Sequence, residues 1–289
     1  MQPNLKQLHQ SAIKYLNEGK VQLAHKSLVE LVSHKPDFAD GYFLLAMVNL
    51  QVGQIYKAIK LIEKALTLGS SIEYTAQLAK CYALTGDLKK AKNVALSVPI
   101  TQIKKALDAD TLGVALTQAG LHEHALHYFE CALTLANAKQ QPQPLFYYNF
   151  AVSAKFLGLF DKAHTAFEHA IALNPLHHQS HFALSDLTKV TKQKNNITRL
   201  KQVFEQVSHP DAKLHIGHAL AKEYQDIGAF SDAFTALQQG KAAKYALTPF
   251  DNASSNALFE HIKQLSAEHK NQQVNGNPTA EPIFVLGMP

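Results

Sequence analysis

The chain has 289 residues, of which 46% are hydrophobic, so it is long enough for one large domain or two. Its formal net charge is +5, and all of its 28 basic residues except Arg199 are lysine. Recognition of nucleic acid usually draws on arginine forks, and we expect the positive charge to be spread thinly along helix surfaces. Composition and charge therefore argue against a nucleic-acid partner.

The amino-terminal sequence has no basic segment followed by an apolar core, so we expect no signal peptide. The most apolar stretch, residues 42–50, is much shorter than the ~20 residues that a membrane-spanning helix needs. Cys81 and Cys131 fall inside predicted helices and are expected to pack as small apolar residues in a reducing environment. These features predict a cytoplasmic protein without a membrane span.

Six glycines recur along the chain, and each is followed five residues later by an alanine. The pairs, in chain order, are Gly19 with Ala24, Gly53 with Ala58, Gly86 with Ala91, Gly120 with Ala125, Gly158 with Ala163, and Gly228 with Ala233. Glycine suits the left-handed position that ends a helix, and alanine suits a place where two helices pack closely. Each period therefore predicts two helices joined by a tight turn. The last spacing is about twice the others, which indicates one repeat without its glycine.

The predicted hairpins lie near residues 5–38, 39–71, 72–105, 106–143, 144–177, 178–211 and 212–245. The segment 178–211 is the degenerate one, because KQKNN replaces the glycine turn. The segment 144–177 is the clearest, with Tyr147 and Phe150 at helical spacing and Asn174-Pro175 stopping the second helix. Its pattern resembles the tetratricopeptide repeat (TPR). The resemblance implies an all-α fold in which residues 1–245 form a right-handed superhelix of about seven repeats.

Residues 246–281 are expected to form a helical linker that ends in the polar run NQQVNGNPTAE. Residues 282–289 then contain the only convincing buried strand, Ile283 to Leu286, followed directly by Gly287, Met288 and Pro289. A strand that runs straight into a glycine turn is how phosphate-binding loops begin, because the backbone amides must be free to face the anion.

The run EPIFVLGMP resembles the start of the sulfotransferase domain in bacterial TPR–sulfotransferase proteins. The segments HFALSDLTKV and LHIGHALAKEYQDIGAFSDAFTALQQGKAAK are similar to the last repeats of that family. The resemblance implies that Gly287, Met288 and Pro289 begin the loop that holds the 5′-phosphosulfate of PAPS (3′-phosphoadenosine 5′-phosphosulfate). It also implies that the parent protein is an enzyme that transfers a sulfuryl group from PAPS to a hydroxyl, such as that of a protein tyrosine. Because the rest of the loop is missing, we expect these 289 residues to bind no cofactor and to hold no catalytic residue.

In TPR arrays the first helix of each hairpin lines a concave groove that commonly binds a peptide. The residues predicted to line it are Phe43, Met47, Tyr148, Asn149, Val152, Lys155 and Phe182. We therefore expect a protein or peptide partner, either the acceptor substrate or another protein, and leave the oligomeric state open. The alternative function is a free-standing TPR adaptor without enzymatic activity, whose carboxy-terminal strand adds to a partner's sheet.

Three histidine pairs would each share a helix face: His124 with His127, His178 with His181, and His215 with His218. Zinc needs three or four ligands in a closed set, and none of these pairs supplies the rest. We expect solvated histidines and no metal site.

Overall fold

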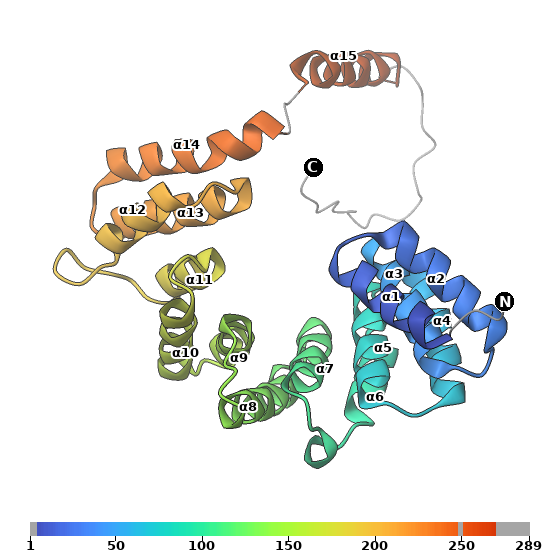
Figure 1. The fold of residues 1–289 in the computed structure, drawn as a ribbon. Helices are drawn as coiled ribbons and strands as arrows, with labels where there is room; N and C mark the ends of the chain where they lie inside the picture. Colours follow the sequence, from blue (N-terminus) through green and yellow to red (C-terminus); the bar gives the residue numbers. More distant parts are fainter. Residues whose placement is uncertain (1–4, 248–250, 270–289) are drawn as a thin grey trace, which may run out of the picture. The chain divides into compact units, whose positions relative to one another are not determined.

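The computed structural model describes residues 5–247 and 251–269. Within these ranges it contains fifteen α-helices, one short 3-10 helix and no strand (Figure 1). The chain divides into two compact units, residues 1–241 and 242–289, with the boundary inside α14. The predicted strand from Ile283 to Leu286 and the loop residues Gly287, Met288 and Pro289 lie outside the described residues.

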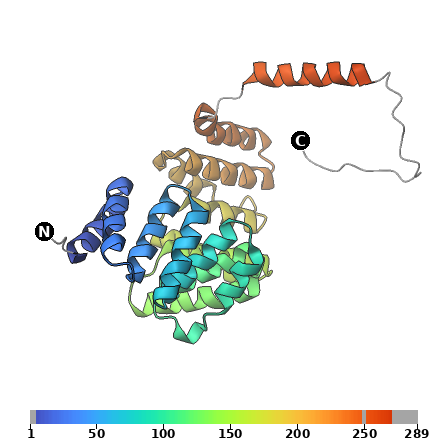
Figure 2. The same ribbon diagram turned by 90° about the vertical axis from the view of Figure 1, so that its right-hand side faces the viewer.

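The first unit is a series of helix pairs that follow one another along the chain (Figures 1 and 2). The pairs are α1 (Leu5–Asn17) with α2 (Val21–His34), α3 (Ala39–Gln51) with α4 (Ile55–Leu68), α5 (Ile72–Leu84) with α6 (Leu88–Leu96), α7 (Ala106–Gln118) with α8 (His122–Ala138), α9 (Pro144–Phe156) with α10 (Phe160–Leu173), α11 (His178–Leu187) with α12 (Ile197–Gln206), and α13 (Pro210–Asp226) with α14 (Phe230–Leu247). A 3-10 turn, η1 (Ile100–Gln102), separates α6 from α7. We number these pairs repeats 1 to 7. They confirm the predicted all-α fold of seven helix-turn-helix repeats.

Each of the six recurring glycines has a positive φ angle, between 69° and 82°. At Gly158 the backbone N–H of the next residue, Leu159, donates to the carbonyl of Ala154 at 2.9 Å, and the N–H of Gly158 donates to Lys155 at 3.0 Å. This pattern satisfies carbonyls at the end of the first helix, and it needs a residue that tolerates the left-handed conformation. The predicted turn role of the glycines is confirmed.

The alanines that follow these glycines are buried where the two helices of a pair meet. Ala24, Ala58, Ala91, Ala125 and Ala163 have no exposed surface, and Ala233 is 8% exposed. This burial agrees with the packing role predicted for these alanines.

In the described part of the chain, the buried apolar side chains form four hydrophobic clusters rather than one continuous core. In chain order they are centred on repeats 1–2, repeats 2–4, repeats 4–6 and repeats 6–7. The first three overlap through partly buried side chains, since Leu61 borders the first two clusters and Phe150 borders the second and third. The main helix contacts lie within one repeat or between adjacent repeats, as expected for a solenoid.

Helices α13 and α14 approach each other closely through two glycines. A Cβ atom on Gly217 would lie 2.6 Å from the Cα atom of Gly240, and a Cβ on Gly240 would lie 2.9 Å from the Cα of Gly217. Both contacts involve backbone, which cannot move aside as a side chain can. Repeat 7 therefore depends on glycine for packing as well as for its turn.

In the second unit the described helix is α15 (Asn252–His269). The carboxylate of Asp251 accepts hydrogen bonds from the backbone N–H groups of Ala253 (3.0 Å) and Ser254 (3.2 Å). Asp251 therefore caps the amino terminus of this helix.

Candidate functional site

The first helices of the repeats, α1, α3, α5, α7, α9, α11 and α13, lie next to one another in chain order and carry all seven predicted groove residues. We call the surface that they present the first-helix face. Side chains on neighbouring first helices contact each other. These contacts determine how much of each predicted residue remains exposed for a partner.

In repeats 1–3 the predicted residues are taken up by packing. The Phe43 ring stacks on the ring of Tyr74, with 4.4 Å between the centroids, and Phe43 is only 4% exposed. The Tyr74 hydroxyl donates to Asp40 at 3.1 Å, and the other oxygen of Asp40 lies 2.5 Å from Nε2 of His9. Met47 is half-buried and packs against the hydrophobic cluster of repeats 2–4, which also contains Phe43. Phe43 thus fills the interface between α3 and α5 and has little surface left for a partner.

In repeats 4 and 5 a buried carboxylate links two first helices. Asp110 on α7 is 4% exposed and accepts a hydrogen bond of 2.9 Å from the side-chain amide of Asn149 on α9. Burial raises the pKa of Asp110 to about 6, although the Asn149 hydrogen bond and the charge of Lys80 act in the opposite direction. Asn149 therefore has a structural partner that the sequence did not indicate.

Two further predicted residues on α9 are half-buried. Tyr148 meets the rings of Phe167 at 5.9 Å and His177 at 5.5 Å, and burial raises the pKa of its hydroxyl. Val152 packs at the edge of the hydrophobic cluster of repeats 4–6. Both side chains keep part of their surface exposed.

The remaining predicted residues connect repeats 5, 6 and 7. The Lys155 ammonium lies 2.5 Å from the carboxylate of Asp186 on α11. The Phe182 ring, also on α11, stacks on His215 with 5.6 Å between centroids and meets the edge of His218 at 6.4 Å. Phe182 is nevertheless 37% exposed. It is therefore the predicted aromatic residue with the most free surface.

The first helices also expose large apolar side chains that the sequence did not single out. These are Ile13, Leu84, Leu107, Leu145 and Phe156, with exposed fractions from 37% to 69%. Their helix positions were predictable, but the repeat pattern alone does not tell which side chains the next repeat covers.

Histidines gather around α11 and α13, and the prediction that they are solvated is wrong there. Nδ1 of His178 and Nδ1 of His215 are 2.7 Å apart, so one ring donates a proton and the other accepts it. Burial and the neighbouring His215 lower the pKa of His178 to about 4. His181 is 1% exposed, and its Nε2 lies 2.9 Å from the carbonyl of Pro175. His124 and His127, in contrast, are exposed as expected.

Metal-ligating side chains and thiols are the other groups that could carry chemistry. Across residues 5–247 and 251–269, no three histidine, cysteine or acidic side chains are grouped so that they would hold a metal ion. Both cysteines are free thiols, and burial raises the pKa of Cys81 to about 11. That thiol is protonated at neutral pH. No helix in the described part is both long and apolar enough to cross a bilayer.

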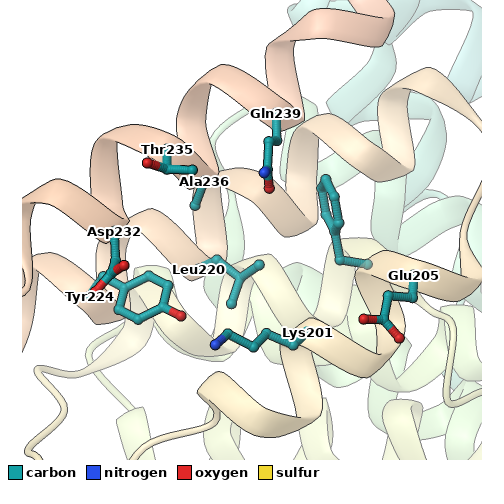
Figure 3. A pocket seen from close by; sticks show the side chains of 9 residues that line it. Lys201, Glu205, Leu220, Tyr224, Asp232, Thr235, Ala236 and Gln239 are labelled. Carbon is teal, nitrogen blue, oxygen red and sulfur yellow. The ribbon is translucent and has the colours of Figure 1, made fainter.

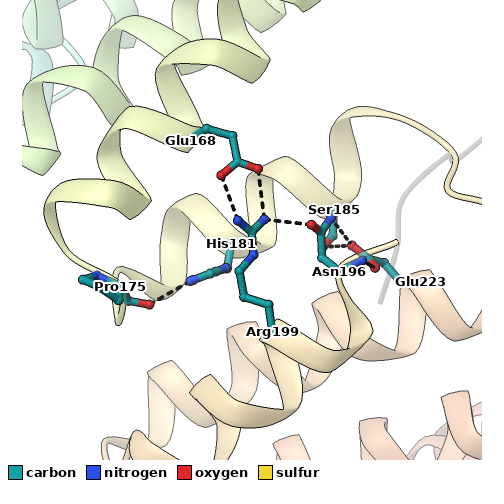
Figure 4. Close-up of polar contacts among 7 residues, drawn as sticks. All are labelled: Glu168, Pro175, His181, Ser185, Asn196, Arg199 and Glu223. Atoms are coloured by element: carbon teal, nitrogen blue, oxygen red, sulfur yellow. Dashed lines mark hydrogen bonds and ion pairs between the residues drawn. The ribbon is translucent and has the colours of Figure 1, made fainter. Parts of the chain in front are cut away.

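Repeat 6 is held by polar side chains that the sequence analysis missed (Figure 4). Arg199 on α12 makes two hydrogen bonds to Glu168 on α10, of 2.8 and 3.1 Å, and a third to the side chain of Asn196 at 2.8 Å. Glu223 on α13 has no exposed surface and accepts from the Ser185 hydroxyl at 2.7 Å and from the backbone N–H of Asn196 at 2.6 Å. The solitary arginine was the one signal in the sequence for this network.

A cleft of about 310 Å³ lies between α12, α13 and α14 (Figure 3). Its lining is mixed, with Lys201, Glu205 and Asp232 as charged groups and the Tyr224 ring 5.6 Å from the Lys201 ammonium. None of the predicted site residues lines it.

Comparison with known proteins agrees with this geometry. Residues 39–68 and 145–175, which fall in repeats 2 and 5, match the family model for the tetratricopeptide repeat. No curated protein sequence matches the chain. The chain contains TPR repeats in a TPR fold.

Among solved structures, a TPR protein from Parabacteroides merdae is similar over 92% of this chain and 99% of its own length, with a TM-score of 0.56 and 16% identity. The carboxy-terminal part of a TPR protein from Cytophaga hutchinsonii is similar over 86% and 99%, with a TM-score of 0.53 and 14% identity. A chain of the APC/C hetero-tetramer Cut9–Hcn1 is similar over 81% of this chain, with a TM-score of 0.57 and 16% identity. This chain spans only 42% of that protein's length. At these identities the likeness is one of fold alone.

Proposed function

We propose that the chain is a protein-interaction region whose first-helix face binds an extended or helical segment of another protein. The main support is the exposed apolar surface on first helices that remains after neighbouring repeats have packed together. In repeats 4–6 it comprises Leu107, Leu145, Phe156 and Phe182. A similar array in the Cut9–Hcn1 complex works within a hetero-tetramer, which is the kind of use proposed here.

We further propose that this interaction region belongs to a PAPS-dependent cytoplasmic sulfotransferase and presents the acceptor to it. The support is the sequence resemblance of residues 178–289, including Gly287, Met288 and Pro289 at the start of the phosphate loop. PAPS is then the cofactor of a longer protein, which transfers the sulfuryl group to a hydroxyl. The other candidate is a scaffold without enzymatic activity.

The interaction proposal is tested with Phe182→Ala and a matched control, Phe234→Ala. Phe234 is 62% exposed but lies on α14, a second helix. Proteins from the native organism are captured with wild type and with both variants. Phe182→Ala is expected to lose its specific partners, because an aromatic anchor often contributes about 2 kcal/mol or more to binding. If Phe182→Ala, Leu107→Ala and Leu145→Ala together retain every partner, the binding surface lies elsewhere.

The sulfotransferase proposal is tested by calorimetric titration with PAP, the desulfated product. A phosphate loop needs several ordered backbone amides and the amino terminus of the following helix, so the 289-residue chain is expected not to bind PAP. A longer protein that continues through the downstream domain is expected to bind it and to transfer sulfuryl. Failure of the longer protein to bind would favour the scaffold function and would leave the interaction proposal standing.

A further inference from the structure

One part of the array carries a marked excess of lysine over acidic residues. Residues 57–105 contain nine lysines and only three acidic residues, whereas the rest of the chain carries slightly more acidic than basic residues. The expected thin spread of positive charge therefore does not hold in this segment. Counted by repeat, the excess is largest in repeat 3, where residues 72–105 contain six lysines and two acidic residues.

Six exposed lysines of this segment lie on two second helices. One of them, Lys90, pairs with Asp87 at 2.9 Å, which leaves five. Lys57, Lys60 and Lys64 follow one another on α4 at spacings of three and four residues, which places them along one stripe of the helix. Lys89 and Lys92 are three residues apart on α6. None of the five ammonium groups has a salt bridge within 4.0 Å among the described residues. By comparison, α8 carries no lysine at all.

A single tyrosine joins the two lysine-bearing helices. The hydroxyl of Tyr82 on α5 donates to Glu63 on α4 at 2.5 Å, and the ammonium of Lys90 on α6 lies 5.1 Å from the centre of the same ring. The Tyr82 side chain thus contacts both α4 and α6. The carboxylate of Glu63 is also taken up by this contact and does not offset the free lysines.

Apolar side chains are interleaved with the lysines. Tyr56 is 72% exposed one turn before Lys60 on α4, and Leu88 is 43% exposed one turn before Lys92 on α6. Leu96, 36% exposed, follows Lys92 by a further turn. Exposed leucines would not contribute to a surface that binds only phosphate groups. Because the surface has no arginine, it also cannot make bidentate contacts to phosphate.

We propose that the surface formed by α4 and α6 binds an acidic, amphipathic segment of a partner protein. Carboxylates spaced by three or four residues on such a segment match the lysine stripe of α4, and its apolar side chains cover Tyr56, Leu88 and Leu96. This surface belongs to second helices, so it is separate from the first-helix face. The proposal does not depend on the function proposed above.

The probe is a synthetic 18-residue helical peptide with glutamates on one stripe and leucines beside it, and its binding to the 289-residue chain is followed by fluorescence anisotropy. The test variant carries Lys57→Gln, Lys60→Gln and Lys64→Gln. The control carries Lys26→Gln, Lys162→Gln and Lys192→Gln, which removes the same charge from exposed sites on α2, α10 and the repeat 6 loop. Melting curves of both proteins verify that they are folded.

The test variant is expected to bind the peptide about tenfold more weakly, because each lost ion pair contributes modestly and three are lost. The control is expected to change less than about twofold, and Tyr56→Ala with Leu88→Ala is expected to weaken binding at unchanged net charge. Equal weakening of test and control variants would mean diffuse attraction and overturn the proposal. Tighter binding of a single-stranded oligonucleotide of equal charge, or of phosphatidylserine vesicles, would overturn it in favour of nucleic acid or a lipid surface.

Discussion

The interface between repeats 2 and 3 and the interface between repeats 6 and 7 join first helices with different chemistry. In the former, Phe43 stacks on Tyr74 amid buried alanines. In the latter, α11 and the loop after it are linked to α13 by four polar contacts: Ser185 to Glu223, His178 to His215, Lys222 to the carbonyl of Thr188, and the N–H of Val190 to Asp226. The repeat that lost its turn glycine is thus joined to its neighbour by more polar contacts than repeats 2 and 3, where the Tyr74 and Tyr82 hydroxyls donate to Asp40 and Glu63.

The largest expected effect is in a regular repeat, where Ala163→Phe would overpack the α9–α10 pair. Ala163 has no exposed surface, so the ring has no space unless the helices separate. We expect a loss of about 3 kcal/mol in the free energy of unfolding, measured by denaturant titration. Lys162→Phe, one residue earlier and exposed, is the control and should cost less than about 0.5 kcal/mol. Wild-type stability for Ala163→Phe would disprove the packing role.

The corresponding change in the polar interface is Glu223→Gln. The amide keeps the shape but turns an N–H donor toward Ser185 or Asn196, which are themselves donors to Glu223. A loss of about 2 kcal/mol is expected, since hydrogen bonds to a buried charged group contribute more than neutral ones. Glu205→Gln on the exposed side of α12 serves as control. If both variants have the melting temperature of the wild type, the network does not stabilise repeat 6.

A smaller loss of stability is expected in the glycine turns of the regular repeats, and none in the glycine-free turn of repeat 6. Gly158 has φ of +73°, and nothing lies within 4 Å of a Cβ added there. Gly158→Ala is therefore expected to lower the free energy of unfolding by about 1 kcal/mol, the cost of the left-handed conformation for a residue with a Cβ. Lys192→Ala, in the turn of repeat 6, should leave the unfolding free energy within about 0.5 kcal/mol of wild type. Equal costs at both positions would show that repeat 6 has the same turn requirement.

The smallest effect is a pH dependence of the polar interface. The pKa of His178 is lowered to about 4, so between pH 6.5 and 4 the unfolded chain binds a proton there that the folded chain does not. This histidine therefore destabilises the fold as the pH falls through that window. Asp110, with its pKa raised to about 6, acts in the opposite sense. The fall in melting temperature from pH 7.5 to pH 5 should be smaller in His178→Asn than in wild type, and unchanged in His124→Asn. An equal fall in melting temperature in all three proteins would show that His178 does not contribute to the pH dependence of stability.

The regular repeats were predictable because their requirements are local. A left-handed turn needs glycine and a close helix pair needs alanine, and both recur at a fixed spacing. The groove residues were harder to assess. Phe43 and Phe182 both lie on first helices, but Tyr74 from the next repeat covers one, whereas His215 and His218 leave the other partly free.

The network of repeat 6 could not be predicted for a related reason. Arg199 and Glu168 are 31 residues apart, and their contact depends on a loop, residues 188–196, whose path follows no repeat. The lysine surface on α4 and α6 was within reach of the sequence, because the nine lysines and three acidic residues between residues 57 and 105 can be counted directly.

The polar interface of repeats 6 and 7 also has a mechanical consequence. Hydrogen bonds weaken steeply with small changes of distance and angle, whereas apolar side chains that slide past one another keep much of their contact. When the two ends of the first unit are pulled apart in an optical trap, the interface between α11 and α13 should rupture abruptly and over a short extension. The interface between repeats 2 and 3, which has fewer polar contacts, should yield more gradually, so the two interfaces would differ in how they open under load.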